Sequence, residues 1–471
     1  MALRGFIIKS IIVFIIVLIA LTLYSTTFNK ESTNVREPKF AGSWYPETKA
    51  QLNSTLEILF QDTKQTENNV KALIVPHAGY KYSGQTAAIA YAQLEKEYNN
   101  IFILAPSHQY PLKEISILNI THYKTPLGKV KLSPTIQQMR SESIIHEIPE
   151  AHEKEHSIEL QIPFLQSKIK NPTIIPMLVG QMDHTILKQT ILKYHTDEDL
   201  IVVSVDLSHF HNQDEAQTLD AYALNKIKHL NTDDIYKAEI DAPYAVATLL
   251  EIAKEKKWKP IILQYTNSGE ITKDKSSVVG YSAIAFIDTI TKDDQKLLLR
   301  IARDTLEKNY LDKLTYNYKI PNILKKKYGC FVTLNKDKDL RGCIGTIEAK
   351  EPLHECIKRN TINAAKNDKR FEPITTEEIN QLEIEISILT PPKPVHFTTT
   401  QELIDQIKTN DGVILEKGLK RSTFLPQVWE NFETKEGFLK SLCEKAKLES
   451  DCYKNTQTKI FTYQAEVFSE S

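Results

Sequence analysis

The stretch "ALIVPHAGY" (residues 72–80) joins a short apolar run to a proline and a histidine, and "IFILAPSHQ" (residues 101–109) repeats this order. Continuous apolar runs of this length, bounded by turn residues, are typical of strands that are buried on both faces. If the residues between the two runs form a helix, the strands are parallel, and His77 and His108 leave the sheet at the same edge. Ligands bind at that edge in open α/β sheets, so the repeated pattern predicts a shared site that contains both imidazoles.

The alternation of apolar runs and amphipathic segments continues along the first 290 residues and predicts an α/β fold, a largely parallel sheet flanked by helices. The sequence "DLSH" (206–209) follows a further run (200–205), so Asp206 and His209 are expected at the same edge. Three strand ends that carry such side chains favour one metal or acid–base site. The other expected elements are a strand at 173–179 and helices at 85–98, 157–168, 220–228 and 244–256.

Length and charge limit the domain count and the kinds of partner. A chain of 471 residues is long enough for two or three domains, and its 59 Lys and Arg nearly balance 60 Asp and Glu. Because no global positive field is present, we expect no nucleic-acid partner and instead a small-molecule or peptide substrate.

The N-terminus departs from this composition. Residues 6–24 are almost wholly apolar and follow Arg4, and no A-x-A-like cleavage site comes after them. These features predict an uncleaved membrane anchor at residues 1–25 and a polar tether at 26–38. The positive charge before the anchor predicts that the bulk of the protein lies outside the cytoplasm.

The first part contains a series of characteristic stretches: "FAGSWYP" (40–46), "PHAGYKYSG" (76–84), "APSH" (105–108), "EHSIELQIPFL" (155–165) and "VVSVDLSH" (202–209). These motifs resemble those of the Memo family, also called protein B of the AmmeMemoRadiSam system. The resemblance extends over about residues 36–290 and implies a domain at 39–290 with the fold of class III extradiol dioxygenases, which hold non-haem iron with two histidines and a carboxylate.

The resemblance also implies roles for individual residues. His77 and His108 become metal ligands, and Tyr80, in the motif of His77, becomes a binding residue. His156 or His209 is expected to move a substrate proton. The expected catalytic group consists of His156, Asp206, His209 and Glu155.

The third metal ligand is a point of departure from the family. Many members place a cysteine before "GxxP" at the start of a late helix, but the first domain here has no cysteine. When Pro243 is taken as the first turn of that helix, the equivalent position is Glu239, and Asp241 is the substitute if the loop shifts. A two-histidine, one-carboxylate set is typical of non-haem Fe(II); Cu and Zn are the alternatives.

The sequence "HEKEH" (152–156) satisfies a competing motif in the same domain. On one helix, His152 and His156 would share a face and bind zinc, with Glu153 as the general base of a metallopeptidase. This alternative requires a helix that contains both histidines.

The last third contains the stretches "YGCFVTLNKDKDLRGCIGTIEAKEPL" (328–353), "RFEPIT" (370–375), "EIEISILTPP" (383–392) and "FLPQVWE" (424–430). With these motifs, it resembles the AMMECR domain, protein A of the same system, over residues 294–469, and a smaller α+β domain is expected there. The fusion implies that the two modules share a task. The name of the system also implies a radical-SAM protein, which would be a separate partner. In "LRGCIG" (340–345), Arg341 and Cys343 are candidate binding residues. Either Arg341 lowers the pKa of the Cys343 thiol and makes it reactive, or Cys343 is a small buried residue of a strand. A disulfide between Cys330 and Cys343 is conceivable, and the remaining cysteines, Cys356, Cys443 and Cys452, are expected to be structural.

These observations favour a metal-dependent, dioxygenase-like or other redox enzyme that contains Fe(II). A non-catalytic peptide-binding or scaffold protein, in which the histidines only form hydrogen bonds, is the alternative.

Overall fold

The computed structural model describes residues 34–470 except 67–68, 95–96, 314–316 and 456. Residue contacts divide the chain into two compact units, Met1–Thr289 and Ile290–Ser471. Each unit has its own hydrophobic core.

The segment expected to anchor the protein, residues 6–24, lies outside the described residues. Among the helices that the structure does describe, none combines the length and the apolar composition needed to cross a bilayer. This finding contradicts the expected localisation, a membrane protein with one N-terminal anchor and its bulk outside the cytoplasm. Residues 35–36 of the expected tether form a strand instead, which pairs with residues 122–123.

The centre of the first unit is a sheet of parallel strands. Its order in the described residues is β1-β5-β6-β8-β3-β9-β2-β12-β10, and β6, β8, β3, β9 and β2 run parallel. The four predicted strands are β2 (Val70–Val75), β3 (Ile101–Ala105), β8 (Thr173–Val179) and β9 (Leu200–Ser204), and their apolar residues are buried on both faces. The sheet margins are antiparallel, so the sheet is mixed. The other strands are β1 (Val35–Arg36), β4 (Ile115–Ser116), β5 (His122–Thr125), β6 (Gly128–Leu132), β7 (Ile145–His146), β10 (His209–His211), β11 (Trp258–Asn267) and β12 (Val278–Asp288).

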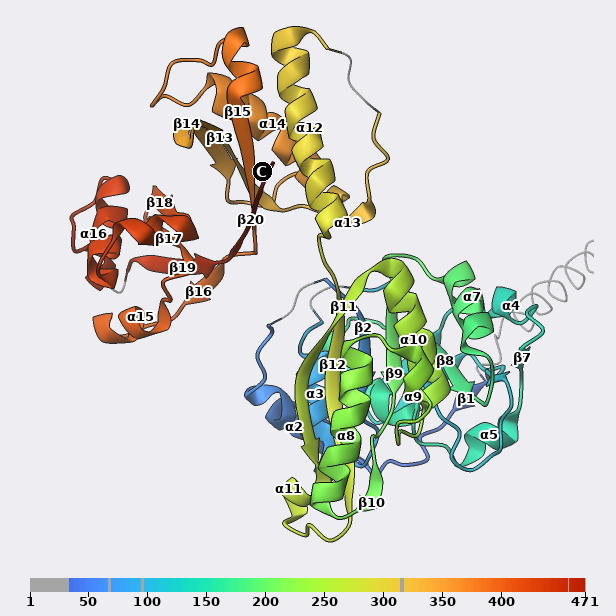
Figure 1. Ribbon diagram of the computed structural model, residues 1–471. Helices are drawn as coiled ribbons and strands as arrows, with labels where there is room; N and C mark the ends of the chain where they lie inside the picture. Colours follow the sequence, from blue (N-terminus) through green and yellow to red (C-terminus); the bar gives the residue numbers. More distant parts are fainter. Residues whose placement is uncertain (1–33, 67–68, 95–96, 314–316, 456, 471) are drawn as a thin grey trace, which may run out of the picture. The chain divides into compact units, whose positions relative to one another are not determined.

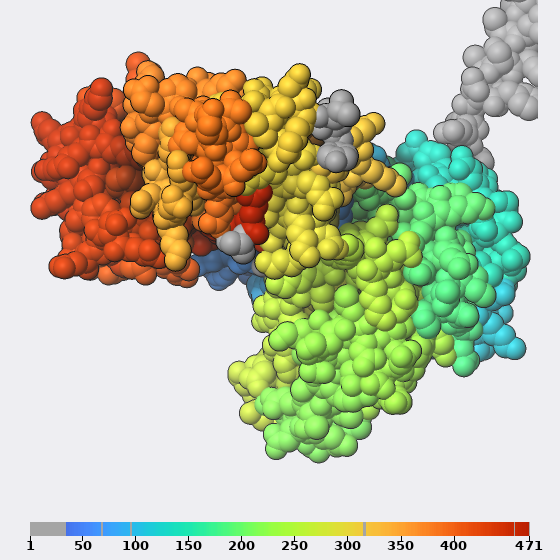
Figure 2. Space-filling model, turned by 45° about the horizontal axis from the view of Figure 1, so that its top comes forward, coloured from blue at the N-terminus to red at the C-terminus, as the bar shows by residue number. Residues whose placement is uncertain are grey.

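Helices cover both faces of this sheet (Figure 1). One layer contains α7 (His184–Tyr194), α8 (Gln213–Lys228) and α10 (Pro243–Lys256), and Figure 2 shows α8 and α10, in green and yellow-green, at the molecular surface. The other layer contains α2 (Lys49–Gln61) and α3 (Tyr80–Tyr91). The shorter elements are α4 (Thr135–Met139), α5 (Pro149–Glu153), η1 (Glu159–Gln161), α6 (Ile162–Lys168), α9 (Thr232–Ile235) and α11 (Ser268–Thr272).

The second unit contains two small antiparallel sheets, β14-β13-β15-β20 and β16-β19-β17-β18 (Figure 1). The long helix α12 (Lys292–Leu311) begins with a capping box formed by Thr291 and Asp294, and packs with α14 (Leu353–Lys366) against the first sheet. The strands are β13 (Gly329–Lys336), β14 (Asp339–Thr346), β15 (Leu382–Leu389), β16 (Lys393–Val395), β17 (Gly412–Lys417), β18 (Lys420–Phe424), β19 (Lys459–Tyr463) and β20 (Ala465–Ser469). The other helices are α13 (Asn322–Lys325), η2 (Thr376–Gln381), α15 (Thr400–Gln406), η3 (Pro426–Asn431), α16 (Lys435–Lys445) and η4 (Cys452–Lys454).

The cysteines pair differently from the expectation. Disulfides join Cys330 to Cys356 and Cys443 to Cys452, and Cys343 is the free thiol. Cys330 lies in β13 on the core side, whereas Cys343 lies opposite Thr333, which faces away from that core, so a bridge between Cys330 and Cys343 is not formed. Cys330 instead forms its disulfide with Cys356 of α14.

A buried histidine beside the first core makes stability depend on pH. His195 follows α7, contacts the rings of Phe102 and Trp258, and has no hydrogen-bond partner at either ring nitrogen. Burial lowers the pKa of His195 to about 4, so the imidazole stays neutral in the folded protein while it takes up a proton near pH 6.5 in the unfolded chain.

The unfolded state therefore binds more protons between these two pKa values, and the free energy of unfolding should fall as the pH falls through this window. We expect His195 to contribute a loss of about 2 kcal/mol between pH 7 and pH 5. Urea denaturation of the wild type and of His195→Leu at both pH values measures this, because the variant should show a smaller loss. Equal losses in the two proteins would contradict the assignment.

Candidate metal centre

Three imidazoles meet at the carboxyl ends of the parallel strands. His77 follows β2 and His108 follows β3, as their positions predict, and His156 joins them from the segment before η1. The ring centroids are 5.1 Å apart for His77 and His108, 5.3 Å for His77 and His156, and 4.8 Å for His108 and His156. Potential ligand atoms of these three residues lie within 4.8 Å of one another.

A carboxylate completes this arrangement, and it belongs to Asp241. Its Oδ2 lies 2.9 Å from Nε2 of His77 and 3.4 Å from Nε2 of His108. The expected residue, Glu239, points elsewhere: its carboxylate pairs with Nε2 of His211 at 2.9 Å and accepts a hydrogen bond from the amide of His209. The loop before α10 therefore presents Asp241, the substitute, to the two imidazoles.

Hydrogen bonds assign the protons of both imidazoles. The Ser204 hydroxyl donates to the Ser157 carbonyl, so its oxygen accepts from Nδ1–H of His77, which is 3.0 Å away. Nδ1 of His108 donates in the same way to the Glu155 carboxylate at 3.0 Å. Both Nε2 atoms therefore point toward Asp241, the arrangement that metal-binding histidines adopt when a second partner holds the other nitrogen.

Glu155 is the residue that orients this part of the site. Its carboxylate accepts hydrogen bonds from the amides of His108, His156 and Ser157 at 2.6, 2.9 and 2.9 Å. Burial would raise the pKa of Glu155, but the hydrogen bonds from His108 and the backbone outweigh burial and lower the pKa to about 2. Glu155 therefore keeps its negative charge and fixes the His108 ring.

The electrostatics of the centre follow from the same neighbours. Burial would lower the pKa of His108, but hydrogen bonds to Asp241 and Glu155 raise it to about 10, and Asp241 and Asp206 raise the pKa of His77 against burial. Burial raises the pKa of Asp206, and the nearby Asp241 adds to this effect, whereas the two imidazoles hold the pKa of Asp241 below its usual range. The site thus stabilises positive charge between the histidines and Asp241.

His156 differs from the other two imidazoles because burial and the charge on His77 lower its pKa to about 3. Its ring packs on Trp44 with 4.1 Å between centroids and contacts Phe40 at 5.6 Å. Trp44 and Ser204 were not predicted as site residues. The polar Ser204 within an otherwise apolar strand was the available signal, while Trp44 stood in a quoted motif without an assigned role.

The other candidate residues of the first unit have different positions. Tyr80 is buried and donates to the Leu160 carbonyl at 2.7 Å. Asp206 accepts from the His77 amide at 2.8 Å, and its carboxylate forms a second group of metal-ligand spacing with His77 and Asp241. The zinc-peptidase motif is not formed, because α5 ends at Glu153 and the buried His152 contacts Ser116 instead.

In the second unit, Arg341 does not activate Cys343. Its guanidinium holds the Glu378 carboxylate at 3.0 and 3.1 Å and donates to the Glu372 carbonyl. Burial raises the pKa of Cys343, although the Thr333 hydroxyl donates to its sulfur at 3.3 Å. The thiol is therefore protonated at neutral pH rather than activated.

Comparison with known proteins gives a match for each unit. Residues 36–285 match the family model described as Memo-like protein, and residues 299–468 match AMMECR1. A MEMO1 family protein of Aquifex aeolicus (strain VF5) is 32% identical over 268 residues, which are 54% of this chain and 99% of the relative. A MEMO1 family protein of Metallosphaera sedula is 34% identical over 282 residues, again 54% of this chain and 99% of the relative.

A crystal structure of an uncharacterised protein from Pyrococcus horikoshii is 35% identical, with a TM-score of 0.35, and the match covers 37% of this chain and 90% of that one. The two resemblances inferred from the motifs are confirmed by the family models. Because the Memo-like match covers more than half of the chain, the protein belongs to the Memo-like family and carries an AMMECR1 domain after its Memo-like domain.

Proposed function

We propose that the Memo-like unit is a metal-dependent enzyme of the redox or dioxygenase-like class, with Fe(II) as its ion. The ligands would be Nε2 of His77, Nε2 of His108 and the carboxylate of Asp241. The convergence of Nε2 of His77 and Nε2 of His108 on one carboxylate, with each Nδ1 held by a second partner, is the observation that supports this proposal most strongly. Such a set leaves coordination positions open for substrate, which is typical of non-haem Fe(II) enzymes.

When bound, the ion supplies Lewis acidity and a redox couple. The chain's own residues position the reacting groups. Nδ1 of His156 faces Glu155 at 3.4 Å, so its Nε2 carries the lone pair that would accept a substrate proton, and the low pKa keeps this imidazole neutral in the resting site. Trp44 and Phe40 form an apolar wall beside His156 that restricts water. A small or peptide-linked substrate is the class that we propose for this site.

Anaerobic titration of the full chain, produced without a histidine tag, tests the function. We expect about one Fe(II) per chain, and we expect nitric oxide to bind to the iron because ligand positions stay open. A wild-type protein that takes up no stoichiometric iron, or whose iron does not bind nitric oxide, would contradict an open catalytic centre. Zn(II) and Cu(II) titrations under the same conditions compare the alternative metals.

A further inference from the structure

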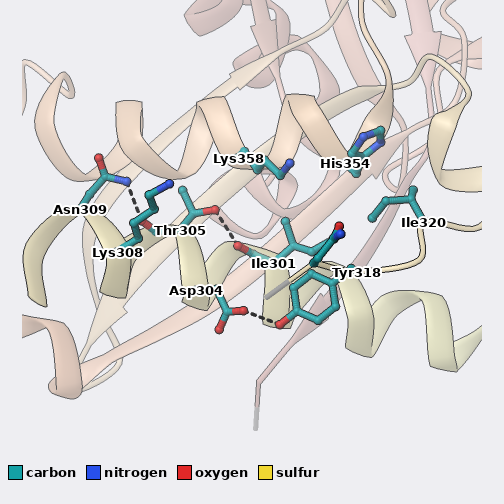
Figure 3. Close-up of a pocket in the computed structure, with 10 residues that line it drawn as sticks. Ile301, Asp304, Thr305, Lys308, Asn309, Tyr318, Ile320, His354 and Lys358 are labelled. Atoms are coloured by element: carbon teal, nitrogen blue, oxygen red, sulfur yellow. Dashed lines mark hydrogen bonds between the residues drawn. The ribbon is translucent and has the colours of Figure 1, made fainter. Parts of the chain in front are cut away.

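Two cavities outside the metal centre differ in how their charges are compensated. The cavity of the second unit, about 520 Å³, lies between α12 and α14, where Lys308 and Lys358 are among its lining residues (Figure 3). Lys358 pairs with Glu355 at 2.9 Å, and Asp304 accepts a hydrogen bond from Tyr318. This cavity therefore carries charges of both signs.

The cavity of the first unit has a different charge pattern. It has a volume of about 610 Å³ and is lined by Lys49, Lys129, Lys131, Lys170 and His122; we call it the lysine groove. Among the described residues that line the lysine groove, none carries a carboxylate. Four ammonium groups around one concave surface raise the local concentration of anions.

The floor of the lysine groove places basic side chains opposite one another. In the β5–β6 hairpin, Lys129 lies directly opposite Lys124, and Lys131 lies directly opposite His122. Like charges directly opposite one another on a hairpin repel and reduce its stability. Glu37 compensates Lys124 at 2.8 Å, but it does not line the groove. An anion in the groove would therefore reduce the repulsion between Lys129 and Lys124.

Other lining groups add hydrogen-bond donors and positive potential. Lys49 is the first residue of the 13-residue helix α2, whose N-cap is Thr48, so the positive end of the helix dipole also lies at the groove. Thr173 lies beside Lys131 in the sheet, and the amide of Asn171 is a further lining group. Backbone and side-chain donors of this kind bind phosphate oxygens.

We propose that the lysine groove binds a small, freely diffusing compound that carries two or more linked phosphate groups. Four lysines would be poorly matched by a single monoanion, whereas linked phosphates can contact several ammonium groups at once. The volume lies in the range of small-molecule sites. This inference rests on residues of α2, β5, β6 and the segment 166–173, and is independent of the metal centre.

Isothermal titration of the full chain with inorganic tripolyphosphate tests the proposal. We expect saturable binding at low salt that weakens as salt is added, and orthophosphate should bind less tightly. Lys129→Gln combined with Lys131→Gln should weaken tripolyphosphate binding at least about tenfold, because charge-assisted hydrogen bonds are lost. The matched control, Lys228→Gln combined with Lys259→Gln, changes two exposed lysines outside the groove and should leave the affinity within about twofold of the wild type.

Each contrary result overturns the proposal. These results are no saturable binding by the wild type, equal weakening in both double variants, and capture of anionic phospholipid vesicles without any affinity for tripolyphosphate. Thermal unfolding without ligand separates loss of binding from loss of fold. The groove variant should keep or raise its midpoint because the opposed charges are gone, and tripolyphosphate should raise the wild-type midpoint but not that of the variant.

Discussion

Asp241→Ala is expected to weaken Fe(II) binding by at least about a hundredfold, whereas Glu239→Ala should change it by less than about twofold. Loss of a residue that only orients a ligand already weakens metal binding about 10 to 100-fold, so loss of the ligand itself should exceed that range. Asp241 lies 2.9 Å from His77, while Glu239 is 41% exposed and pairs with His211. Anaerobic competition with a colorimetric Fe(II) chelator measures both affinities.

The comparison of Asp241→Ala with Glu239→Ala requires that both variants remain folded. Asp241→Ala also removes the acceptor of a hydrogen bond from the Asp206 amide, so Asp241→Asn, which keeps the shape but loses the charge, serves as a second variant. If Glu239→Ala lost iron as strongly as Asp241→Ala, the ligand set proposed here would be wrong. Equal thermal midpoints of the two alanine variants would show that the difference in affinity arises at the metal.

Glu159→Ala should lower the free energy of unfolding by about 3 to 5 kcal/mol, because it leaves a buried guanidinium without its counter-charge. The Glu159 carboxylate is fully buried and lies 2.5 Å from Arg36. It also accepts hydrogen bonds from the amides of Lys39 and Phe40 and from the Tyr45 hydroxyl, each at 2.9 Å. The Glu159 side chain therefore fixes the segment that contains Trp44, whose ring packs on His156.

Urea denaturation of the Memo-like unit within the full chain measures the loss, and Glu57→Ala on the exposed side of α2 is the matched control. Replacement of both buried partners, Arg36→Met together with Glu159→Leu, should recover part of the stability because no unpaired charge remains. A loss below about 1 kcal/mol in Glu159→Ala would mean that water reaches Arg36 and that the segment is not held in this way.

The strands that define the site were predictable from the sequence because they are apolar throughout. β2, β3, β8 and β9 are buried on both faces, and this burial requires the continuous runs from which they were predicted. Helix starts were harder to predict. α8 begins at Gln213, seven residues before the predicted start, because Asn212 caps a polar first turn that has no apolar periodicity.

The third carboxylate shows what the sequence could not decide. The helix α10 begins at Pro243, the position from which the ligand was counted. Asp241, two positions before Pro243, reaches the histidines, whereas Glu239, four positions before it, does not. The outcome depends on the backbone path of residues 239–242, which local propensity does not determine. The partner of Cys330 was hidden for a similar reason, since it lies on a helix packed against the strand.

All five cysteines of this protein lie beyond residue 329, so the Memo-like unit contains no sulfhydryl group. With Asp241 in the position facing His77 and His108, the imidazole and carboxylate donors of that unit offer no target to thiol-specific reagents or to disulfide exchange. Changes in the cellular thiol pool would instead act on the bridges and the single thiol of the AMMECR1 unit.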